Sequence, residues 1–547
     1  MDVRVQTEMK STMMSVPLNL SHFLERAGKL FARQEIVSRL PDKSLHRYTY
    51  ADFYRRARLL AEALQKAGLR RGDRVATLMW NHYAHYEAYF GVIVSGGVMH
   101  TLNLRLAPDD IGFIARHAQD RFLIVDDILL PLLEQFRSQL DLERVIVVPL
   151  TGKPVGGGYD DYEAFLCTAN GDFTYPEMDE NEPCAMCYTS GTTGRPKGVV
   201  YSHRSQILHS LVQAMPDAIG ISGKDVILPV VPMFHANAWG LPYTTAMLGV
   251  KMVFPGPHLH PDDLLPLLES EQVTLSCGVP TIWLPMAQLI AANPGKWKLS
   301  SKLRLTVGGS AVPEAMIRAY AALGIEVLQG WGMTETSPLA TISKVTAQQS
   351  SLSEDERFAV LAKQGYPLPL VDVRTISEEG EVPWDGNTVG EVQVRGPWIT
   401  GSYHQQATPE NFTEDEWLRT GDVASIDALG FLKITDRTKD LIKSGGEWIS
   451  SVNLENAIMG HPAVQEAAVI AVPHPKWSER PLAVIVLRPG AQASEGDIRT
   501  HLLKQFVKWM VPDAYVFVDA IPRTSTGKFL KTRLRELYQD WKWADCV

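Results

Sequence analysis

The chain has 547 residues, and at about 150 residues per domain this length predicts three to four folding units rather than one small module. Hydrophobic residues make up 45% and charged residues 21% of the sequence, which excludes a disordered or fibrous chain and provides for a large core. The formal net charge is −9 and no sustained basic run occurs, so nucleic acid is excluded as the main expected partner.

The cysteines and the N-terminus indicate the compartment. Five cysteines in so long a chain do not form a disulfide framework, and their odd number favours reduced thiols. Cys184 and Cys187 form a C-x-x-C pair inside an apolar run without a second ligand pair, so we interpret both as buried small hydrophobic residues. No apolar stretch approaches the ~18 residues that span a bilayer, and residues 1–20 contain no apolar signal-peptide core. The sequence therefore predicts a cytoplasmic protein without a transmembrane segment.

In chain order, short apolar runs first alternate with helical patterns, which is typical of α/β sheets with crossover helices. In the first stretch, 44–150, a helix is expected at 86–99 and strands are expected at 74–80, 122–126 and 145–149. In the second stretch, 225–328, strands are expected at 226–231, 251–254, 273–277 and 303–307. This repetition predicts two α/β units in tandem.

From Glu381 the pattern changes to short glycine-rich segments such as 390–396 and 430–435, which predict a small β unit. The C-terminal part is expected to form strand, strand, helix and strand at 466–472, 482–487, 496–510 and 515–518. The predicted fold class is therefore α/β and α+β multidomain. A large N-terminal domain at 15–436 contains two α/β sheets and a β subdomain at about 366–436, and a mobile C-terminal α+β domain occupies 437–547.

The densest chemical signal is the segment Tyr188-Thr-Ser-Gly-Thr-Thr-Gly-Arg-Pro-Lys-Gly198, which follows an apolar run. Its glycines let the backbone turn and present N–H groups, its hydroxyls add donors, and Lys197 adds a positive charge, a combination that suits a polyphosphate. Gly198 follows Lys197 where a Walker A loop has Ser or Thr. We interpret the segment as an ATP-binding loop of another type rather than an ordinary polar turn.

This loop resembles the hallmark loop of the adenylate-forming superfamily, which includes acyl-CoA synthetases, luciferases and carrier-protein adenylation domains. Further motifs occur in the order typical of that family, at 232–239, 308–310, 329–336, 419–422, 436–440 and 522–528. The resemblance covers nearly the whole chain and implies a two-step reaction. A carboxylic acid first attacks the α-phosphate of ATP to give an acyl-adenylate and pyrophosphate, and the acyl group then passes to a thiol.

Because the acid and ATP are both anions, the barrier of the first step is mainly electrostatic, and preorganised cations and donors lower it. The resemblance implies that Glu335 binds Mg²⁺ with help from Thr189 and that Thr334 bonds the α-phosphate. It also implies that Lys528 bridges the substrate carboxylate and the α-phosphate. The expected catalytic set is therefore Lys528, Glu335, Thr334 and His235.

The resemblance also implies the rest of the nucleotide site. Its expected ATP- and AMP-binding residues are Thr189, Ser190, Gly191, Thr192, Thr193, Gly194, Lys197, Gly309, Ser310, Gln329, Gly330, Trp331, Asp422, Arg437, Lys439 and Lys443. Within this set Asp422 is expected to accept hydrogen bonds from the ribose hydroxyls, while Arg437 contacts ribose or phosphate. Lys439 lies in the hinge about which the C-terminal domain turns between the two steps.

The resemblance places the thiol and the acid on different segments. After the hinge turns, a CoA-side loop with Ser444, Gly445, Gly446 and Trp448 is expected to approach the pantetheine arm. His235, Ala236 and Trp239 are expected to line the acyl pocket, with Trp239 as its gate. No carrier domain follows Lys528, so free CoA is the expected thiol.

Segments at 234–240, 362–367 and 442–452 look like those of bacterial medium- and long-chain fatty acyl-CoA synthetases, and equally like those of ligases for methylmercaptopropionate. The expected function is therefore an AMP-forming, Mg²⁺- and ATP-dependent acyl-CoA ligase for a medium- or long-chain fatty acid, with acyl chain length and a homodimer left open. The alternatives are a ligase for methylmercaptopropionate or another short-chain acid, a luciferase-like monooxygenase, and a non-catalytic acyl- or nucleotide-binding protein. The joint presence of the residues predicted to bind phosphate, metal and ribose argues against the last.

Overall fold

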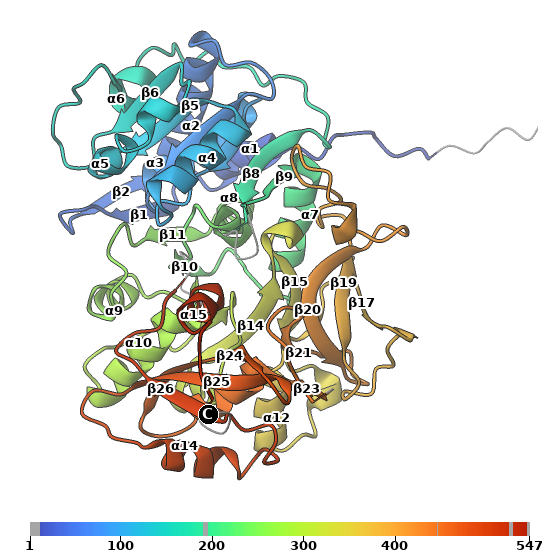
Figure 1. Cartoon of the computed structure of the whole chain (residues 1–547). Coiled ribbons are helices and arrows are strands. Elements are labelled where there is room, and N and C mark those ends of the chain that lie inside the picture. The colour runs from blue at the N-terminus through green and yellow to red at the C-terminus, as the bar shows by residue number, and fades with distance from the viewer. Residues whose placement is uncertain (1–10, 190–194, 446, 524–528, 544–547) are drawn as a thin grey trace, which may run out of the picture.

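The computed structural model describes residues 11–189, 195–445, 447–523 and 529–543. Its N-terminal sheet has the strand order β7-β6-β5-β3-β4-β8-β9 and is parallel except for the β8–β9 pair (Figure 1). The strands are β3 (Arg74–Leu78), β4 (Val98–Thr101), β5 (Asp120–Asp126), β6 (Arg144–Val148), β7 (Asp160–Asp161), β8 (Pro183–Tyr188) and β9 (Gly198–Ser202). The helices of this part are α2 (Tyr50–Lys66), α3 (Tyr83–Val94), α4 (Pro108–Ala118), α5 (Leu130–Leu133) and α6 (Tyr162–Leu166).

The second sheet has the order β16-β15-β14-β13-β12-β10-β11-β1-β2. Its strands are β1 (Glu35–Arg39), β2 (Leu45–Thr49), β10 (Val226–Pro229), β11 (Lys251–Phe254), β12 (Leu275–Gly278), β13 (Arg304–Val307), β14 (Glu326–Gly332), β15 (Leu339–Ser343) and β16 (Tyr366–Pro367). The helices associated with it are α1 (Ser21–Leu30), α7 (His203–Ala214), α8 (Leu241–Leu248), α9 (Pro261–Ser270), α10 (Pro280–Ala292), α11 (Glu314–Ala322) and α12 (Glu354–Leu361).

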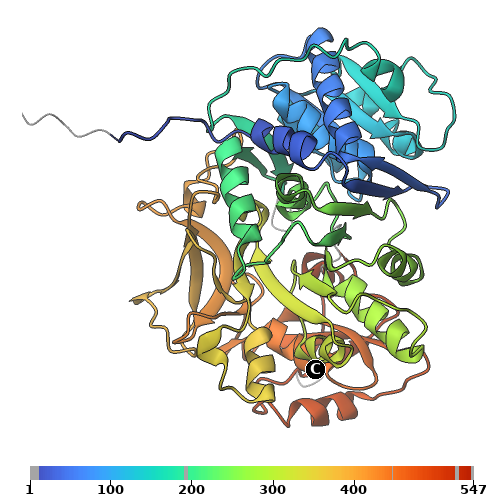
Figure 2. The same ribbon diagram turned by 180° about the vertical axis from the view of Figure 1, so that it is seen from behind.

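The two predicted α/β sheets are present in the predicted order, since the strands expected in 44–150 lie in the first sheet and those expected in 225–328 lie in the second. Among the described strands, only β1 and β2, which the sequence pattern did not identify, depart from this order, because they precede the first sheet in the chain and join the second. Strand β1 pairs in parallel with β11 of the second sheet, while β4 pairs with β8 to complete the first. Helix α1 packs on α8, as the view from behind shows (Figure 2). The sequence pattern could not reveal the pairing of β1 with β11, because an apolar run identifies a strand but not its neighbour. One hydrophobic core consequently joins both sheets.

The expected helix at 86–99 is also wrong at its C-terminal end. Helix α3 ends at Val94, Gly96 adopts a φ of +93°, and β4 then begins at Val98. Because Val98 and Met99 are buried in a parallel strand, their apolar side chains continued the apolar pattern of the helix without continuing its backbone.

A third, antiparallel sheet has the order β18-β17-β19-β20-β21. Its strands are β17 (Asp372–Ser377), β18 (Gly380–Glu381), β19 (Gly390–Arg395), β20 (Leu418–Ile426) and β21 (Leu432–Arg437). The C-terminal α+β part follows, with β22 (Ile442–Ser444), β23 (Glu447–Ile449), α13 (Ser451–Met459), β24 (Val464–His474), β25 (Ser478–Leu487), α14 (Glu495–Leu502), β26 (Ala514–Phe517) and α15 (Lys531–Leu537). The numerical domain boundaries given above stay predictions.

The expected helix at 496–510 is too long, because α14 ends at Leu502 and turns follow. Phe506 and Met510 in these turns still pack against the C-terminal core, so the apolar spacing reflects burial and not helical backbone. Across the described part of the chain, the helices are too short or too polar for any of them to cross a membrane.

Candidate active site

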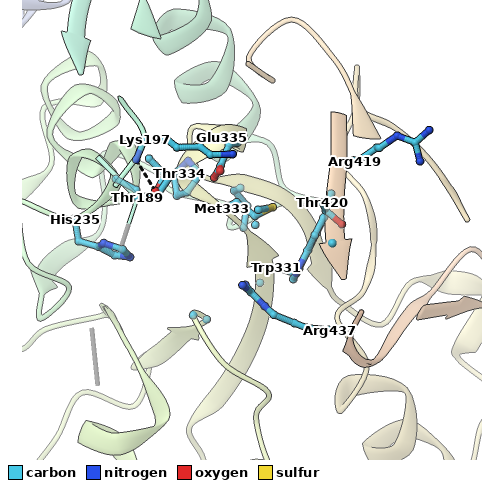
Figure 3. A pocket seen from close by; sticks show the side chains of 18 of the residues that line it. Thr189, Lys197, His235, Trp331, Met333, Thr334, Glu335, Arg419, Thr420 and Arg437 are labelled. Atoms are coloured by element: carbon cyan, nitrogen blue, oxygen red, sulfur yellow. Dashed lines mark hydrogen bonds between the residues drawn. The ribbon is translucent and has the colours of Figure 1, made fainter. Parts of the chain in front are cut away.

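A cavity of about 370 Å³ opens between the second sheet, the antiparallel sheet and the connector after β21. One end is lined by Thr189, Lys197, Thr334 and Glu335, another by Trp331 and Arg437, and a third by His235 (Figure 3). Ala236 and Trp239 also line the cavity. The structure therefore brings together residues predicted for phosphate, nucleotide and acyl binding. Ser190, Gly191, Thr192, Thr193 and Gly194 lie outside the described residues, as do Gly446 and Lys528.

The base of the phosphate loop is closed by two hydrogen bonds. The Thr189 N–H donates to the Lys197 carbonyl over 2.9 Å, and the Lys197 N–H donates to Thr189 Oγ1 over 3.0 Å. The Lys197 ammonium group donates to Asn411 Oδ1 over 2.8 Å and lies 4.7 Å from the centre of the Tyr403 ring. The loop thus brings a cation to the same end of the cavity as Glu335.

Glu335 is held in a tight turn that follows β14. Gly332 is required there, because a Cβ at this position would lie 1.6 Å from the Pro338 carbonyl oxygen. The Glu335 side chain is only 6% exposed in a turn at Thr334–Thr336, and its Oε1 accepts a hydrogen bond from the Tyr403 hydroxyl over 2.8 Å. The Thr334 carbonyl accepts from the Tyr201 hydroxyl over 2.8 Å. Side chains from other elements therefore fix the turn.

Asp422 lies behind the nucleotide end of the cavity. Its Oδ2 accepts from the Trp331 indole over 2.9 Å, and its Oδ1 lies 3.1 Å from Arg437 Nε. Trp331 and Arg437 line the cavity, whereas Asp422 is buried and is absent from the described lining. Its proposed contact with ribose stays a prediction.

Small residues shape the wall next to Trp331. Gly309, with a φ of +82°, and Gly330 line the cavity, and a Cβ at Gly308 would lie 2.9 Å from the Gly330 carbonyl oxygen. Because these glycines carry no side chains, this wall of the cavity leaves room for a flat group. Ser310 and Gln329 do not belong to the described lining, and the Gln329 amide is directed to the Ala362 carbonyl at 3.4 Å.

The acyl end is built on an unusual turn. The four residues Ala236–Trp239 have φ values of +42° to +58°, a left-handed conformation that non-glycine residues rarely adopt. Gln213 of α7 holds this turn, because its Nε2 donates to the Trp239 carbonyl over 2.6 Å and its Oε1 accepts from Thr244 over 2.7 Å. The turn directs Trp239 into the cavity, where Gln213 is also part of the wall.

Lys439, in the predicted hinge, lines the cavity, and burial lowers the pKa of its ammonium group. Of the predicted CoA-side residues, Ser444, Gly445 and Trp448 lie in the hairpin β22–β23, beyond the described cavity lining. Lys443 is exposed with its ammonium 5.4 Å from the ring centre of Trp448, which is 51% exposed, and Ser444 accepts from Arg480 over 2.9 Å. Gly445 has a φ of +61°. Their roles toward ATP and CoA stay predictions.

The connector is anchored to the C-terminal domain by buried charges. The Ser451 N–H and hydroxyl both donate to Asp436 Oδ2 over 2.6 Å, and Arg535 pairs with Asp440. Lys531 lies 2.7 Å from Glu455, a carboxyl whose pKa burial raises to about 7. The two aspartates of the hinge segment, Asp436 and Asp440, therefore hold it to the C-terminal domain.

Three site residues that the sequence did not reveal are Tyr403, Asn411 and Gln213. Each contacts a predicted site residue through a side chain, and each lies outside the residues singled out from the sequence. An isolated Tyr, Asn or Gln has no spacing that would have identified it.

Comparisons with known proteins show which proteins this sequence is similar to. Residues 24–404 match the family described as AMP-binding enzyme, and residues 453–528 match the AMP-binding enzyme C-terminal domain. The chain is 52% identical over 536 residues to a long-chain-fatty-acid–CoA ligase of Thermus thermophilus, with 97% of each chain covered. It is 42% identical to a medium-chain-fatty-acid–CoA ligase of Ectopseudomonas oleovorans and 43% identical to a 3-methylmercaptopropionyl-CoA ligase of Ruegeria lacuscaerulensis, with 97% of this chain covered in both and 98% and 99% of those proteins.

Solved structures agree with the fold. The crystal structure of the anthranilate CoA ligase AuaEII in complex with anthranoyl-AMP superposes with a TM-score of 0.84 at 26% identity, covering 97% of this chain and 99% of that one. ATP-bound MatB from Rhodopseudomonas palustris gives a TM-score of 0.83 at 26% identity, covering 96% and 99%. The first carries an acyl-adenylate and the second ATP.

Proposed function

The chain belongs to the AMP-binding enzyme family, and on this premise we propose that it is an AMP-forming ligase that joins medium- or long-chain fatty acids to CoA. The family and the fold class predicted from the sequence are confirmed. One structural observation supports the proposal most directly. A single cavity runs from Lys197 and Glu335 past His235 to Trp239, so an acid seated at the acyl end points its carboxylate at the phosphate end.

The chain's own groups supply electrostatic stabilisation to the first step. Lys197, Thr334 and His235 line the cavity. We propose that Lys197 contacts the polyphosphate and that Thr334 and His235 contact the α-phosphate and the carboxylate. Lys528, outside the described residues, is proposed to neutralise the charge that develops between them. Each of these groups positions an anion rather than forming a covalent bond with it.

The donors at the phosphate end suit Mg²⁺. A hard cation bound to phosphates needs one or two protein oxygens, and Glu335 together with the Thr189 hydroxyl provides them. The Glu335 carboxylate is buried with one oxygen engaged by Tyr403, which leaves its other oxygen for the cation. When bound, the ion would neutralise phosphate charge. The ATP held by a relative of similar fold supports ATP as the nucleotide.

CoA is the proposed acceptor. The chain matches three relatives over nearly their whole length, and all three are CoA ligases. This supports free CoA as the thiol. The hinge residue Lys439 and the hairpin β22–β23 are proposed to bring the C-terminal domain to the cavity in the second step. Cytoplasmic location remains part of this proposal, and a homodimer stays open.

A second acid deserves comparison, because 43% identity to a 3-methylmercaptopropionyl-CoA ligase is close to that found for the medium-chain enzyme. The deciding experiment is a pyrophosphate-release screen over fatty, thioether and aromatic acids, run with and without CoA. We expect release to be fastest with medium- or long-chain acids, and AMP and thioester to accumulate only with CoA.

Highest activity with the thioether acid would favour the second candidate. Light emission or oxygen uptake would indicate a luciferase-like reaction, and no pyrophosphate with any acid would revive the non-catalytic binding protein.

A further inference from the structure

A loop between β19 and β20 reaches the phosphate end of the cavity, although it comes from the antiparallel sheet. Two of its side chains, Tyr403 and Asn411, contact the two residues predicted to act on the phosphates, Glu335 and Lys197. Neither residue belongs to a motif identified in the sequence. Their contacts indicate what the loop does.

Tyr403 holds Glu335 through a single hydrogen bond. The Tyr403 hydroxyl is the donor to Glu335 Oε1 over 2.8 Å, and both side chains are buried. The same loop fixes the main chain, because the Thr400 N–H donates to the Glu335 carbonyl over 2.8 Å. One carboxylate oxygen is thereby occupied and the orientation of the other is set.

Lys197 is held by two weaker contacts. Asn411 Oδ1 accepts from its ammonium group over 2.8 Å, and the Tyr403 ring lies 4.7 Å away. An amide oxygen and an aromatic face are neutral partners, and both bind an ammonium group less strongly than a phosphate does. The loop therefore keeps the cation at the phosphate end and allows an incoming phosphate to replace the amide.

We propose that Tyr403 and Asn411 are positioning residues for the activation step. Tyr403 orients Glu335 so that its second oxygen faces the Mg²⁺ that accompanies ATP, and Asn411 holds Lys197 in place until a phosphate takes over. This inference rests on the function proposed above.

The first test compares Tyr403→Phe with the wild-type enzyme. Phenylalanine keeps the ring beside Lys197 and removes only the hydroxyl. We expect the Mg²⁺ concentration for half-maximal pyrophosphate release to rise about 10- to 100-fold, as for the loss of one hydrogen bond to a charged group, with the KM for the acid unchanged. Calorimetry should show weaker binding of ATP with Mg²⁺ and unchanged binding of ATP in EDTA. Tyr159→Phe is the matched control, because it removes a tyrosine–glutamate hydrogen bond, to Glu134, remote from the cavity.

The second test separates the two roles. Asn411→Asp places a carboxylate beside Lys197, which phosphate must then displace, so we expect a KM for ATP about 10-fold higher than in the wild type. Asn411→Ala should raise it only about 2- to 3-fold, because the ring contact remains. Neither change should alter the Mg²⁺ requirement.

Three results would overturn the proposal. The first is a wild-type Mg²⁺ requirement in Tyr403→Phe, and the second is an equal loss of affinity for ATP with and without Mg²⁺. The third is an identical KM for ATP in Asn411→Asp and Asn411→Ala. A wild-type protein that binds ATP with Mg²⁺ but releases no pyrophosphate with any acid would instead overturn the proposed function, while the calorimetric comparison would still decide the positioning roles.

Discussion

Trp331 on β14 donates its indole N–H to Oδ2 of Asp422 on β20 over 2.9 Å, so this hydrogen bond joins the second sheet to the antiparallel sheet across the nucleotide end of the cavity. The other oxygen of Asp422 lies 3.1 Å from Arg437 Nε. Because both partners line the cavity, the buried carboxylate fixes two walls at once. Nucleotide affinity should therefore depend on this hydrogen bond.

Replacing Trp331 by Phe keeps most of the aromatic surface and removes the donor to Asp422. We expect the KM for ATP to rise about 5- to 20-fold, equivalent to about 1–2 kcal/mol for a buried carboxylate that loses a partner, with the KM for the acid unchanged. Steady-state kinetics with each substrate varied in turn measures both constants. Trp297→Phe, whose ring packs on a separate core cluster, is the control. Parallel increases in both KM values would contradict this assignment.

Gln213 is expected to control acyl selectivity through the left-handed turn that it holds. Gln213→Leu keeps a similar volume and removes the hydrogen bonds to the Trp239 carbonyl and to Thr244. Without these hydrogen bonds the turn relaxes toward ordinary φ values and Trp239 shifts. The ratio of kcat/KM between long and short fatty acids should therefore change by about 10-fold. The KM for ATP should stay constant. A uniform loss with every acid would indicate damaged folding instead.

Lys528→Ala should separate the two half-reactions. We expect acyl-adenylate formation to slow by about 100- to 1000-fold, because one preorganised charge at the reacting phosphate is lost. Thioester formation from presupplied acyl-adenylate should be much less affected. Single-turnover assays of each step, with Lys542→Ala as a control near the same terminus, test this. Comparable losses in both steps would refute the division of labour.

We expect Lys531 to stabilise the C-terminal domain strongly. Its ammonium group is buried 2.7 Å from Glu455 and hydrogen-bonds Ser451, which in turn holds Asp436 of the hinge segment. Lys531→Met leaves these carboxylates without their cation, and we expect a loss of about 3–5 kcal/mol in the free energy of unfolding, measured with urea. The double variant Lys531→Met/Glu455→Gln should recover part of that loss. Wild-type stability in the single variant would show that the charges are not coupled.

The free energy of unfolding should also fall in mild acid. Burial lowers the pKa of His209 to about 3 and that of His203 to about 4, from 6.5 for an unperturbed histidine. As pH falls below 6.5, the unfolded chain binds protons that the folded chain refuses, so stability is lost, by about 1.4 kcal/mol per pH unit for each such histidine. Glu455 has the opposite effect, because its raised pKa of about 7 lets the folded state bind a proton first.

The contribution of His209 is isolated by comparison with His209→Gln, which can still accept from the Leu339 N–H. Urea unfolding between about pH 7.5 and pH 5 measures how the free energy of unfolding depends on pH. For the variant this free energy should fall less steeply as the pH falls, by the equivalent of about one proton taken up on unfolding. Identical slopes for the two proteins would mean that His209 is protonated in the folded state.

The sequence alone predicted the chemistry of this protein, because the phosphate loop, the turn around Glu335 and the hinge are short continuous motifs that resemble those of the adenylate-forming superfamily and can be recognised without a fold. It also predicted the α/β sheets and the C-terminal α+β domain from apolar runs, since burial imposes its period locally. The predicted C-terminal ends of α3 and α14 were wrong, because buried residues of the following strand or turns continued the apolar spacing of the helix.

Only the tertiary structure decided which strands share a sheet and which side chains support the site. Tyr403 reaches Glu335 across 68 residues of sequence, and Asn411 reaches Lys197 across 214. Contacts of this kind arise when separate sheets pack together, and a lone Tyr or Asn has no local partner that would reveal them. Motif residues are therefore visible in the sequence, whereas the residues that position them are fixed by packing between distant segments.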